Sequence, residues 1–447
     1  MQLQPMFPPA ASVHTLHDAD VDDDAMYAPE AQAELSRRLD RFARTQDPSA
    51  LWPGLTEHAR VAAAGEIERV TREVLSGQPH VRMNPDAAHH VYALSVAAHT
   101  TGMGPLFGRW LETQRIAAAP AVHDRLAWQL LHARRRAARM EREVLPALDA
   151  MIAADIVPVV LKGFHTARAY FEEPGVRRMS DIDVLIAPNQ VQRAEAALQA
   201  AGWRATGPRM TPYKQDWIGA GVDERVFSVE ASDERTKWVI ELHASLNRTF
   251  HPGAIARLDS ERSRTVPFAV RNRNLLALAP PVLLLSLACH CSQELGSSRL
   301  LRLVEIIRVI RAEHGAVRID WDDFLVMLYR TGAARYAYPA LALAENLSPG
   351  TVDERVLRLG ARESTWAARH TLQRLVPAGG SIEALGLLRQ IMWMRGPVAF
   401  LHRAMRLVAP SSQGRPGLLP SWRVRLRQMR AGSLSIGAPD ERPRSQR

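Results

Sequence analysis

Two aspartates separated by one residue are the feature of this sequence that most directly suggests chemistry. Asp181 and Asp183 lie in the stretch DIDVLI, whose alternating apolar residues predict a β-strand. Because side chains alternate across a strand, both carboxylates point to one face and Ile182 points to the other. Neighbouring carboxylates repel each other, and a divalent cation relieves that repulsion. We expect magnesium, which prefers oxygen ligands and keeps water and substrate phosphates around it.

Glu241 is the expected third metal ligand. It lies mid-strand in TKWVIELHASL, an apolar run in which an unpaired carboxylate would be costly to bury. Together with Asp181 and Asp183 it would suit two magnesium ions about 3.5–4 Å apart, with manganese as a substitute. His243 shares the face of Glu241, and two readings stay open. It donates a hydrogen bond to a ligand or substrate, or it is an ordinary strand histidine.

A phosphate-binding site is expected at Lys162 and Gly163. The stretch VPVVLKG predicts a short strand, and FHTARAYF after it predicts a helix, so Gly163 opens the helix. There the backbone can approach a phosphate closely and the helix N-terminus favours negative charge. The ammonium of Lys162 could reach the same phosphates. Arg178, three residues before Asp181, is expected to hold a phosphate or to pair with an acid.

The elements that position these residues predict an α/β (α+β) fold. A small mixed-sheet core is flanked by N-terminal and C-terminal helical regions, because helical periodicity dominates on both sides of residues 155–250. The expected boundaries are a loosely structured leader at 1–48, a helical region at 49–150, a catalytic core at 151–270, a helical domain at 271–395 and a basic, partly disordered segment at 396–447.

Composition excludes several classes of protein. Hydrophobic residues make up 47% and charged residues 23% of the 447, as in ordinary folded domains. The two cysteines, Cys289 and Cys291, are too few and too close for a disulfide framework. No signal peptide is recognisable, and Pro280 and Pro281 interrupt the longest apolar run. We therefore expect a cytoplasmic protein.

The net charge of +10 raises the question of an anionic partner. Arginine supplies most of it, at residues 134–139 and after residue 395, but few aromatic residues accompany these clusters as a single-strand binding groove would require. A nucleic-acid partner is therefore less favoured than a small anionic substrate. The amphipathic, cationic stretch WMRGPVAFLHRAMRLV could contact a membrane surface or pack on the protein body.

Several of these motifs together resemble the uncharacterised nucleotidyltransferase family of the polymerase-beta-like superfamily. The resemblance is carried by LKG at 161–163, Tyr170, Arg178, DID at 181–183, the helix ending at Gly202, and IELH at 240–243. It extends over roughly residues 90–345. It implies metal-binding roles for Asp181, Asp183 and Glu241. Phe164 stands where the superfamily's phosphate loop has serine, and His290 matches a histidine that follows the core.

The resemblance implies transfer of a nucleoside monophosphate from an NTP, expected to be ATP, to a hydroxyl of an acceptor with release of pyrophosphate. The expected acceptor is a small molecule. Two alternatives remain: a toxin-type enzyme that modifies a protein or tRNA, and a non-catalytic nucleotide-binding or scaffold protein on the same fold. Fold alone does not decide among them.

Overall fold

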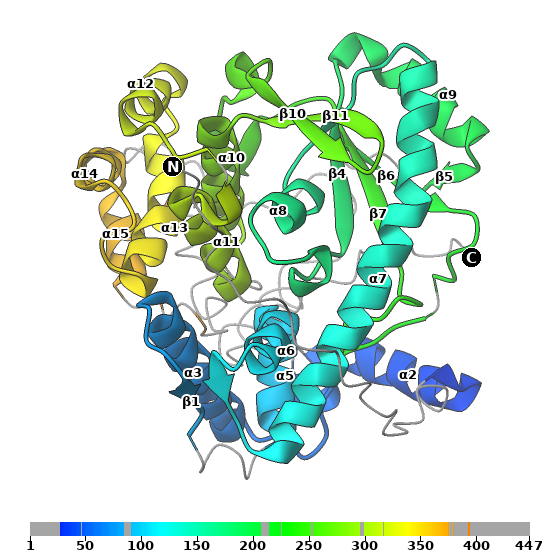
Figure 1. Cartoon of the computed structure of the whole chain (residues 1–447), viewed down its shortest axis with the longest axis vertical. Coiled ribbons are helices and arrows are strands. Elements are labelled where there is room, and N and C mark those ends of the chain that lie inside the picture. Colours follow the sequence, from blue (N-terminus) through cyan, green and yellow to red (C-terminus); the bar gives the residue numbers. More distant parts are fainter. Residues whose placement is uncertain are drawn as a thin grey trace, which may run out of the picture.

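The structure is a computed structural model that describes residues 27–45, 47–84, 91–206, 214–224, 226–251, 254–295, 299–315 and 317–373, with residues 375, 378, 392 and 393. Most of the predicted leader and the basic segment at 396–447, including its suggested membrane contact, lie outside these residues. Within them, helices surround a mixed sheet, which confirms the predicted α/β fold class (Figure 1).

A seven-stranded sheet lies at the centre of the described chain. Its strands, in spatial order, are β10 (Thr265–Val270), β11 (Arg273–Leu278), β3 (Val159–Val160), β4 (Asp181–Leu185), β7 (Val239–His243), β6 (Lys214–Gly219) and β5 (Trp203–Ala205). β4 runs parallel to β7, whereas β3 and β6 are antiparallel to these two. Two small strand pairs lie outside this sheet: β1 (Val81–Arg82) with β2 (Ile116–Ala117), and β8 (Arg248–His251) with β9 (Ala254–Ala256).

The two faces of the sheet differ in what covers them. Ile182 and Ile240, which point away from the acids, are fully buried in a core that includes residues of α7 (Pro120–Ala153) and α9 (Val191–Ala200). Leu185, on the face of the acids, belongs to a second core with residues of α10 (Pro280–Gln293) and α11 (Arg299–Arg311). The acids therefore face the helices that follow the sheet.

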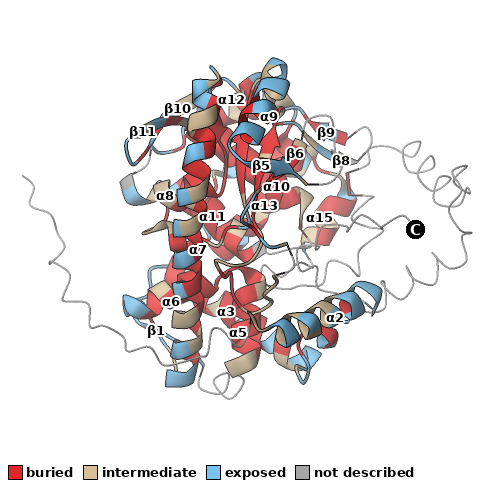
Figure 2. Cartoon of the chain, turned by 90° about the vertical axis from the view of Figure 1, so that its right-hand side faces the viewer, coloured by how far each residue is buried: buried red, intermediate tan, exposed pale blue. Residues whose placement is uncertain are grey.

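The 34-residue helix α7 crosses the whole molecule and contributes to both cores (Figure 1). The remaining helices of eight or more residues are α2 (Pro29–Thr45), α3 (Glu57–Leu75), α5 (Val91–Thr101), α6 (Gly104–Glu112), α12 (Trp321–Thr331), α13 (Ala334–Leu347) and α14 (Glu354–Glu363); the shorter α8 and α15 span Phe164–Ala169 and Trp366–Leu372. Most of the helices bury one apolar face against the sheet or α7, whereas α2 is largely exposed to solvent (Figure 2).

The chain from residue 271 onward begins differently from the predicted helical domain. β11 occupies Arg273–Leu278 before α10 begins at Pro280. A proline fits the first turn of a helix because the backbone N–H that it lacks would have no partner there. Pro280 and Pro281 therefore begin α10, and the apolar residues before them form strand β11.

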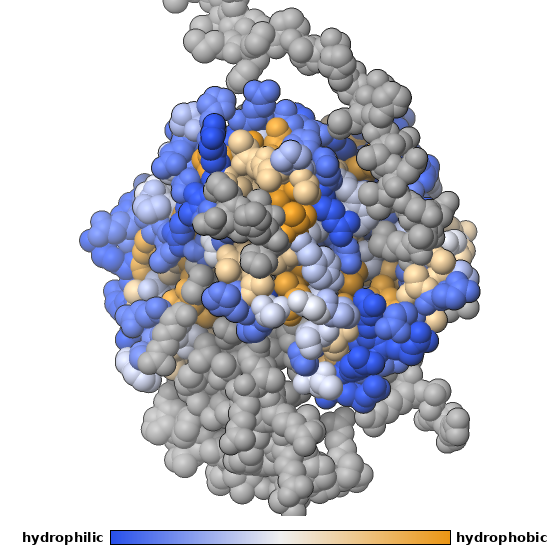
Figure 3. Space-filling view, turned by 90° about the horizontal axis from the view of Figure 1, so that it is seen from below, coloured by the Kyte–Doolittle hydropathy of each residue, from blue (hydrophilic) through white to orange (hydrophobic). Residues whose placement is uncertain are grey.

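The face seen from below Figure 1 is hydrophilic at its rim, with apolar residues near its middle (Figure 3).

Candidate active site

Strand register brings the predicted metal ligands into one row. Asp183 on β4 is the register partner of Glu241 on β7, and Glu241 is in turn the partner of Asp216 on β6. Register partners in adjacent strands share a face, so these three carboxylates lie side by side. Asp181 precedes Asp183 by two residues on the same face. The structure thus places Glu241 next to the aspartate pair and adds Asp216, a buried acid that the sequence reading missed.

His243 links two of these acids. Its Nε2 donates a hydrogen bond to Oδ1 of Asp183 at 2.9 Å and lies 3.3 Å from Oε2 of Glu241. Ligand atoms of Asp183, Glu241 and His243 all lie within 4.8 Å of one another. Two carboxylates and an imidazole so arranged are a donor set that divalent cations accept, and the residues present therefore fit a metal ion.

The carboxylate of Asp181 has no hydrogen bond or ion pair with any residue that the structure describes. Burial raises the pKa of its carboxyl to about 6, and the charges of Asp183 and Glu241 add to the effect while Lys162 opposes it. A partly buried carboxylate without a partner carries a free-energy cost. A metal ion bound at this carboxylate would offset that cost.

Two lysines already pair with the neighbouring acids. Nζ of Lys162 lies 2.6 Å from Oδ2 of Asp183, and Nζ of Lys214 lies 2.9 Å from Oε2 of Glu241 and 4.0 Å from Oδ1 of Asp216. Burial would lower the pKa of Lys162, but the charges of Asp183, Asp181 and Glu241 outweigh it and raise that pKa. Burial would likewise raise the pKa of Asp183, yet Lys162 and His243 hold it well below its ordinary value.

Gly163 lies in a tight turn directly after Lys162. Its φ of +72° suits glycine, and its N–H donates to Oγ1 of Thr166 at 3.1 Å. Oγ1 of Thr166 in turn contacts the buried carboxylate of Glu305 on α11. Glu305 also accepts two hydrogen bonds from Arg177, at 2.8 and 2.9 Å. A buried network therefore joins α11, the Lys162–Gly163 turn and the segment leading into β4.

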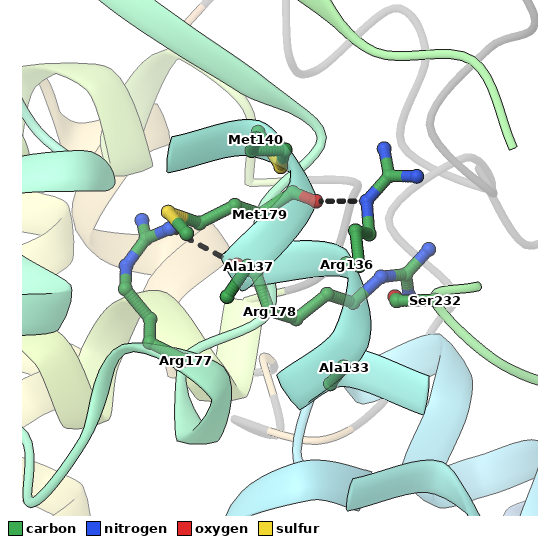
Figure 4. Close-up of a pocket in the computed structure, with 8 residues that line it drawn as sticks. All are labelled: Ala133, Arg136, Ala137, Met140, Arg177, Arg178, Met179 and Ser232. Carbon is green, nitrogen blue, oxygen red and sulfur yellow. Dashed lines mark hydrogen bonds between the residues drawn. The ribbon is translucent and has the colours of Figure 1, made fainter. Parts of the chain in front are cut away.

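Arg178 lines a narrow pocket next to α7, and it points there together with Arg136, whereas Arg177 points to the opposite side (Figure 4). Nη1 of Arg178 donates to the carbonyl oxygen of His99 at 2.6 Å, and burial lowers its pKa to about 10. The predicted contact of Arg178 with a phosphate or an acid stays a prediction. Arg177 is the arginine whose guanidinium lies near Gly163.

Arg136, in the middle of α7, holds the segments that lead into β4 and β7. Its guanidinium donates to the carbonyl oxygens of Met179, Asp233, Thr236 and Lys237 at 2.8–2.9 Å. Met179 lies two residues before β4, and Lys237 two residues before β7. One side chain of α7 therefore fixes both acid-bearing strands to the same helix.

The helices opposite the acids carry further charged groups. Arg302 on α11 pairs with Glu294 at the end of α10, and the charge of Asp181 acts on Arg302. His290 on α10 is buried, and burial, aided by the charges of Arg302 and Lys162, holds its pKa well below the ordinary value. His290 is thus a neutral, buried histidine near the site.

The sequence reading missed Lys214, Asp216, Arg177, Glu305 and Arg302. Arg177 lies four residues before Asp181, but it precedes the start of β4, so strand alternation could not place it. Glu305 offered no signal, since it comes to Arg177 from 128 residues away. Lys214 and Asp216 lie on β6, which begins with three polar residues and was therefore not recognised as a strand from the sequence.

One comparison with known proteins identifies a family for this chain. The model of the uncharacterised nucleotidyltransferase family matches residues 90–349, more than half of the chain, and the chain belongs to that family. The matched region contains β3 to β11, with every acid and lysine described above. No curated protein and no solved structure shows significant similarity to the chain. Within the described ranges, none of the helices combines the length and apolar character that a membrane crossing requires.

Proposed function

We propose that the protein is a magnesium-dependent nucleotidyltransferase that moves a nucleoside monophosphate from an NTP, ATP being the expected donor, to a hydroxyl of a small-molecule acceptor in the cytoplasm. The single observation that carries the proposal is the register pairing of Asp183 with Glu241, with Asp181 two residues away on the same face. Membership of the family supports the reaction class.

Each side chain then has a role that follows from its place. Asp181, Asp183 and Glu241 would hold magnesium or manganese, and His243 would orient Asp183 and Glu241 through its Nε2 or join them as a ligand. Bound metal would polarise phosphate oxygens and lower the pKa of the attacking hydroxyl. Lys162, Gly163 and Arg178 are the proposed nucleotide-binding residues, and the cations would neutralise charge on the triphosphate.

A non-catalytic nucleotide-binding protein on the same fold is the second candidate. One observation favours it: Lys162 and Lys214 already neutralise Asp183 and Glu241, as in a site that needs no metal. The unpaired Asp181 favours the enzyme, because a scaffold gains nothing from a carboxylate whose pKa burial raises to about 6. The net charge of +10 keeps tRNA as an alternative acceptor.

The test is nucleotide transfer by the whole chain, followed as pyrophosphate release and as label passing from α-labelled NTP into small molecules, protein or RNA of a cell extract. Asp183→Asn should lower transfer by on the order of 100-fold or more, because it removes a charged metal ligand. The matched control is Asp322→Asn, whose side chain is 79% exposed on α12. Metal-dependent NTP binding without transfer, unchanged in Asp183→Asn, would establish the non-catalytic alternative.

A further inference from the structure

The ammonium of Lys162 lies among the proposed metal ligands. It is 2.6 Å from Oδ2 of Asp183, and the charges of Asp183, Asp181 and Glu241 all act on it. Oδ1 of Asp183 accepts the hydrogen bond from His243, so both oxygens of this central carboxylate already have partners. We infer, on the basis of the proposed function, that the ammonium of Lys162 takes the place of a metal cation beside Asp183 when no metal is bound. Nucleotide binding must then draw this ammonium away from Asp183 before metal binds tightly.

Competition for Asp183 follows from charge and distance together. A magnesium ion would sit about 2.0–2.1 Å from a carboxylate oxygen. An ammonium hydrogen-bonded to Oδ2 of the same carboxylate at 2.6 Å would lie within a few ångströms of that ion, and two cations so close repel each other in a buried site. Metal therefore binds Asp183 more weakly while the ammonium of Lys162 stays beside it.

Burial restricts where that ammonium can go. Lys162 is only 8% exposed, at the end of β3 between the sheet and α8. Leaving a buried ammonium without a counter-ion is costly, so metal alone displaces Lys162 at a penalty. The phosphates of an NTP provide the new counter-ion, because the sequence places Lys162 directly before the turn at Gly163. Metal and nucleotide should thus strengthen each other's binding by the same factor.

Lys214 provides a matched comparison. It also pairs with a proposed metal ligand, since its Nζ is 2.9 Å from Glu241, but its side chain is 28% exposed and it comes from the next strand beyond β7. When metal binds, its ammonium can turn toward water. Removing Lys214 removes the same charge from the cluster without vacating the position beside Asp183.

The experiment measures Mn²⁺ affinity of the whole chain by isothermal titration and by electron paramagnetic resonance, without nucleotide, for wild type, Lys162→Met and Lys214→Met. We expect Lys162→Met to tighten Mn²⁺ binding by about tenfold or more, and by more than Lys214→Met does. Near-ultraviolet circular dichroism checks that each variant is folded. An effect of Lys162→Met no larger than that of Lys214→Met would overturn the inference, because charge alone would then explain it.

A second measurement needs no variant. A non-hydrolysable NTP analogue should tighten Mn²⁺ binding to the wild type by about tenfold to a hundredfold, and an affinity independent of the analogue contradicts the inference even if Lys162→Met fails to fold. The two proposals fail differently. Absence of Mn²⁺ binding from every variant, with and without the analogue, sinks the proposed function, whereas nucleotide-independent Mn²⁺ binding that Asp183→Asn abolishes sinks the inference alone.

Discussion

The carboxylate of Asp181 differs from those of Asp183 and Glu241 in having no hydrogen bond or ion pair with any described residue, although Asp181 begins the same strand as Asp183. Its pKa of about 6 means that the folded protein holds this proton more tightly than the unfolded chain does. The folded state is therefore penalised as pH rises from about 4 to above 6, where the carboxyl becomes charged in a partly buried place.

Asp181→Asn should consequently stabilise the metal-free protein while removing a metal ligand. Above pH 7 we expect the free energy of unfolding to exceed that of the wild type by about 1–3 kcal/mol, and the difference to shrink toward zero near pH 4. Urea unfolding in the presence of a chelator, at pH 4, 6 and 8, measures it. A variant less stable than the wild type at pH 8 would show that the carboxylate has a stabilising partner.

At the scale of elements, the site depends on helix α11 as well as on the strands. Glu305, only 1% exposed, joins Arg177 before β4 to Thr166 in α8, and so ties the Lys162–Gly163 turn to α11. All of these residues lie within the region that the family model matches.

Glu305→Gln should destabilise the protein by about 3–5 kcal/mol, because it leaves the guanidinium of Arg177 buried without its counter-ion. Glu354→Gln, at a side chain 77% exposed on α14, is the control and should change stability by less than about 0.5 kcal/mol. Denaturant unfolding of both variants gives the comparison. Equal effects would mean that the Arg177–Glu305 pair contributes little.

Sequence patterns predicted the elements that obey simple periodicity. Alternation at Asp181–Asp183 and at Glu241–His243 placed each pair on one strand face, and β4 and β7 are strands there. The convergence of Glu241 with the aspartates was expected from the residue types, but the register that pairs Asp183 with Glu241 was not predicted, because register depends on contacts between distant strands. The ion pair of Lys162 with Asp183 was not predicted, since a side chain that suits phosphate suits a carboxylate equally well.

At the scale of the whole molecule, the helices before the family match are part of the same core. Ile67 and Val70 of α3 are fully buried with residues of α10, α11 and α13. Arg311 of α11 donates to the carbonyl oxygen of Leu75 at 2.9 Å, and Arg72 reaches Asn346. The matched region is therefore not separable from the preceding helices by its packing.

A chain beginning at residue 91 should accordingly lose on the order of 5 kcal/mol or more, since four buried aliphatic side chains of α3 (Ile67, Val70, Val74 and Leu75) each contribute about 1.5–3 kcal/mol. We expect a less cooperative urea transition and increased binding of a hydrophobic dye, both measured against the full chain. A truncated chain that unfolds as cooperatively as the full one, at the same midpoint, would show that α3 is dispensable for the core.

The contacts of Arg136 have a consequence for how the site responds to its ligands. This guanidinium binds the chain two residues before β4 and at the approach to β7, so neither strand can slide along the other without breaking several charged hydrogen bonds. The spacing of Asp183 and Glu241 is thereby set during folding, by a buried side chain whose hydrogen bonds are made within the protein. Little ordering of the backbone is then left for the moment of binding, and adaptation to different acceptors falls to side chains and to the surrounding helices.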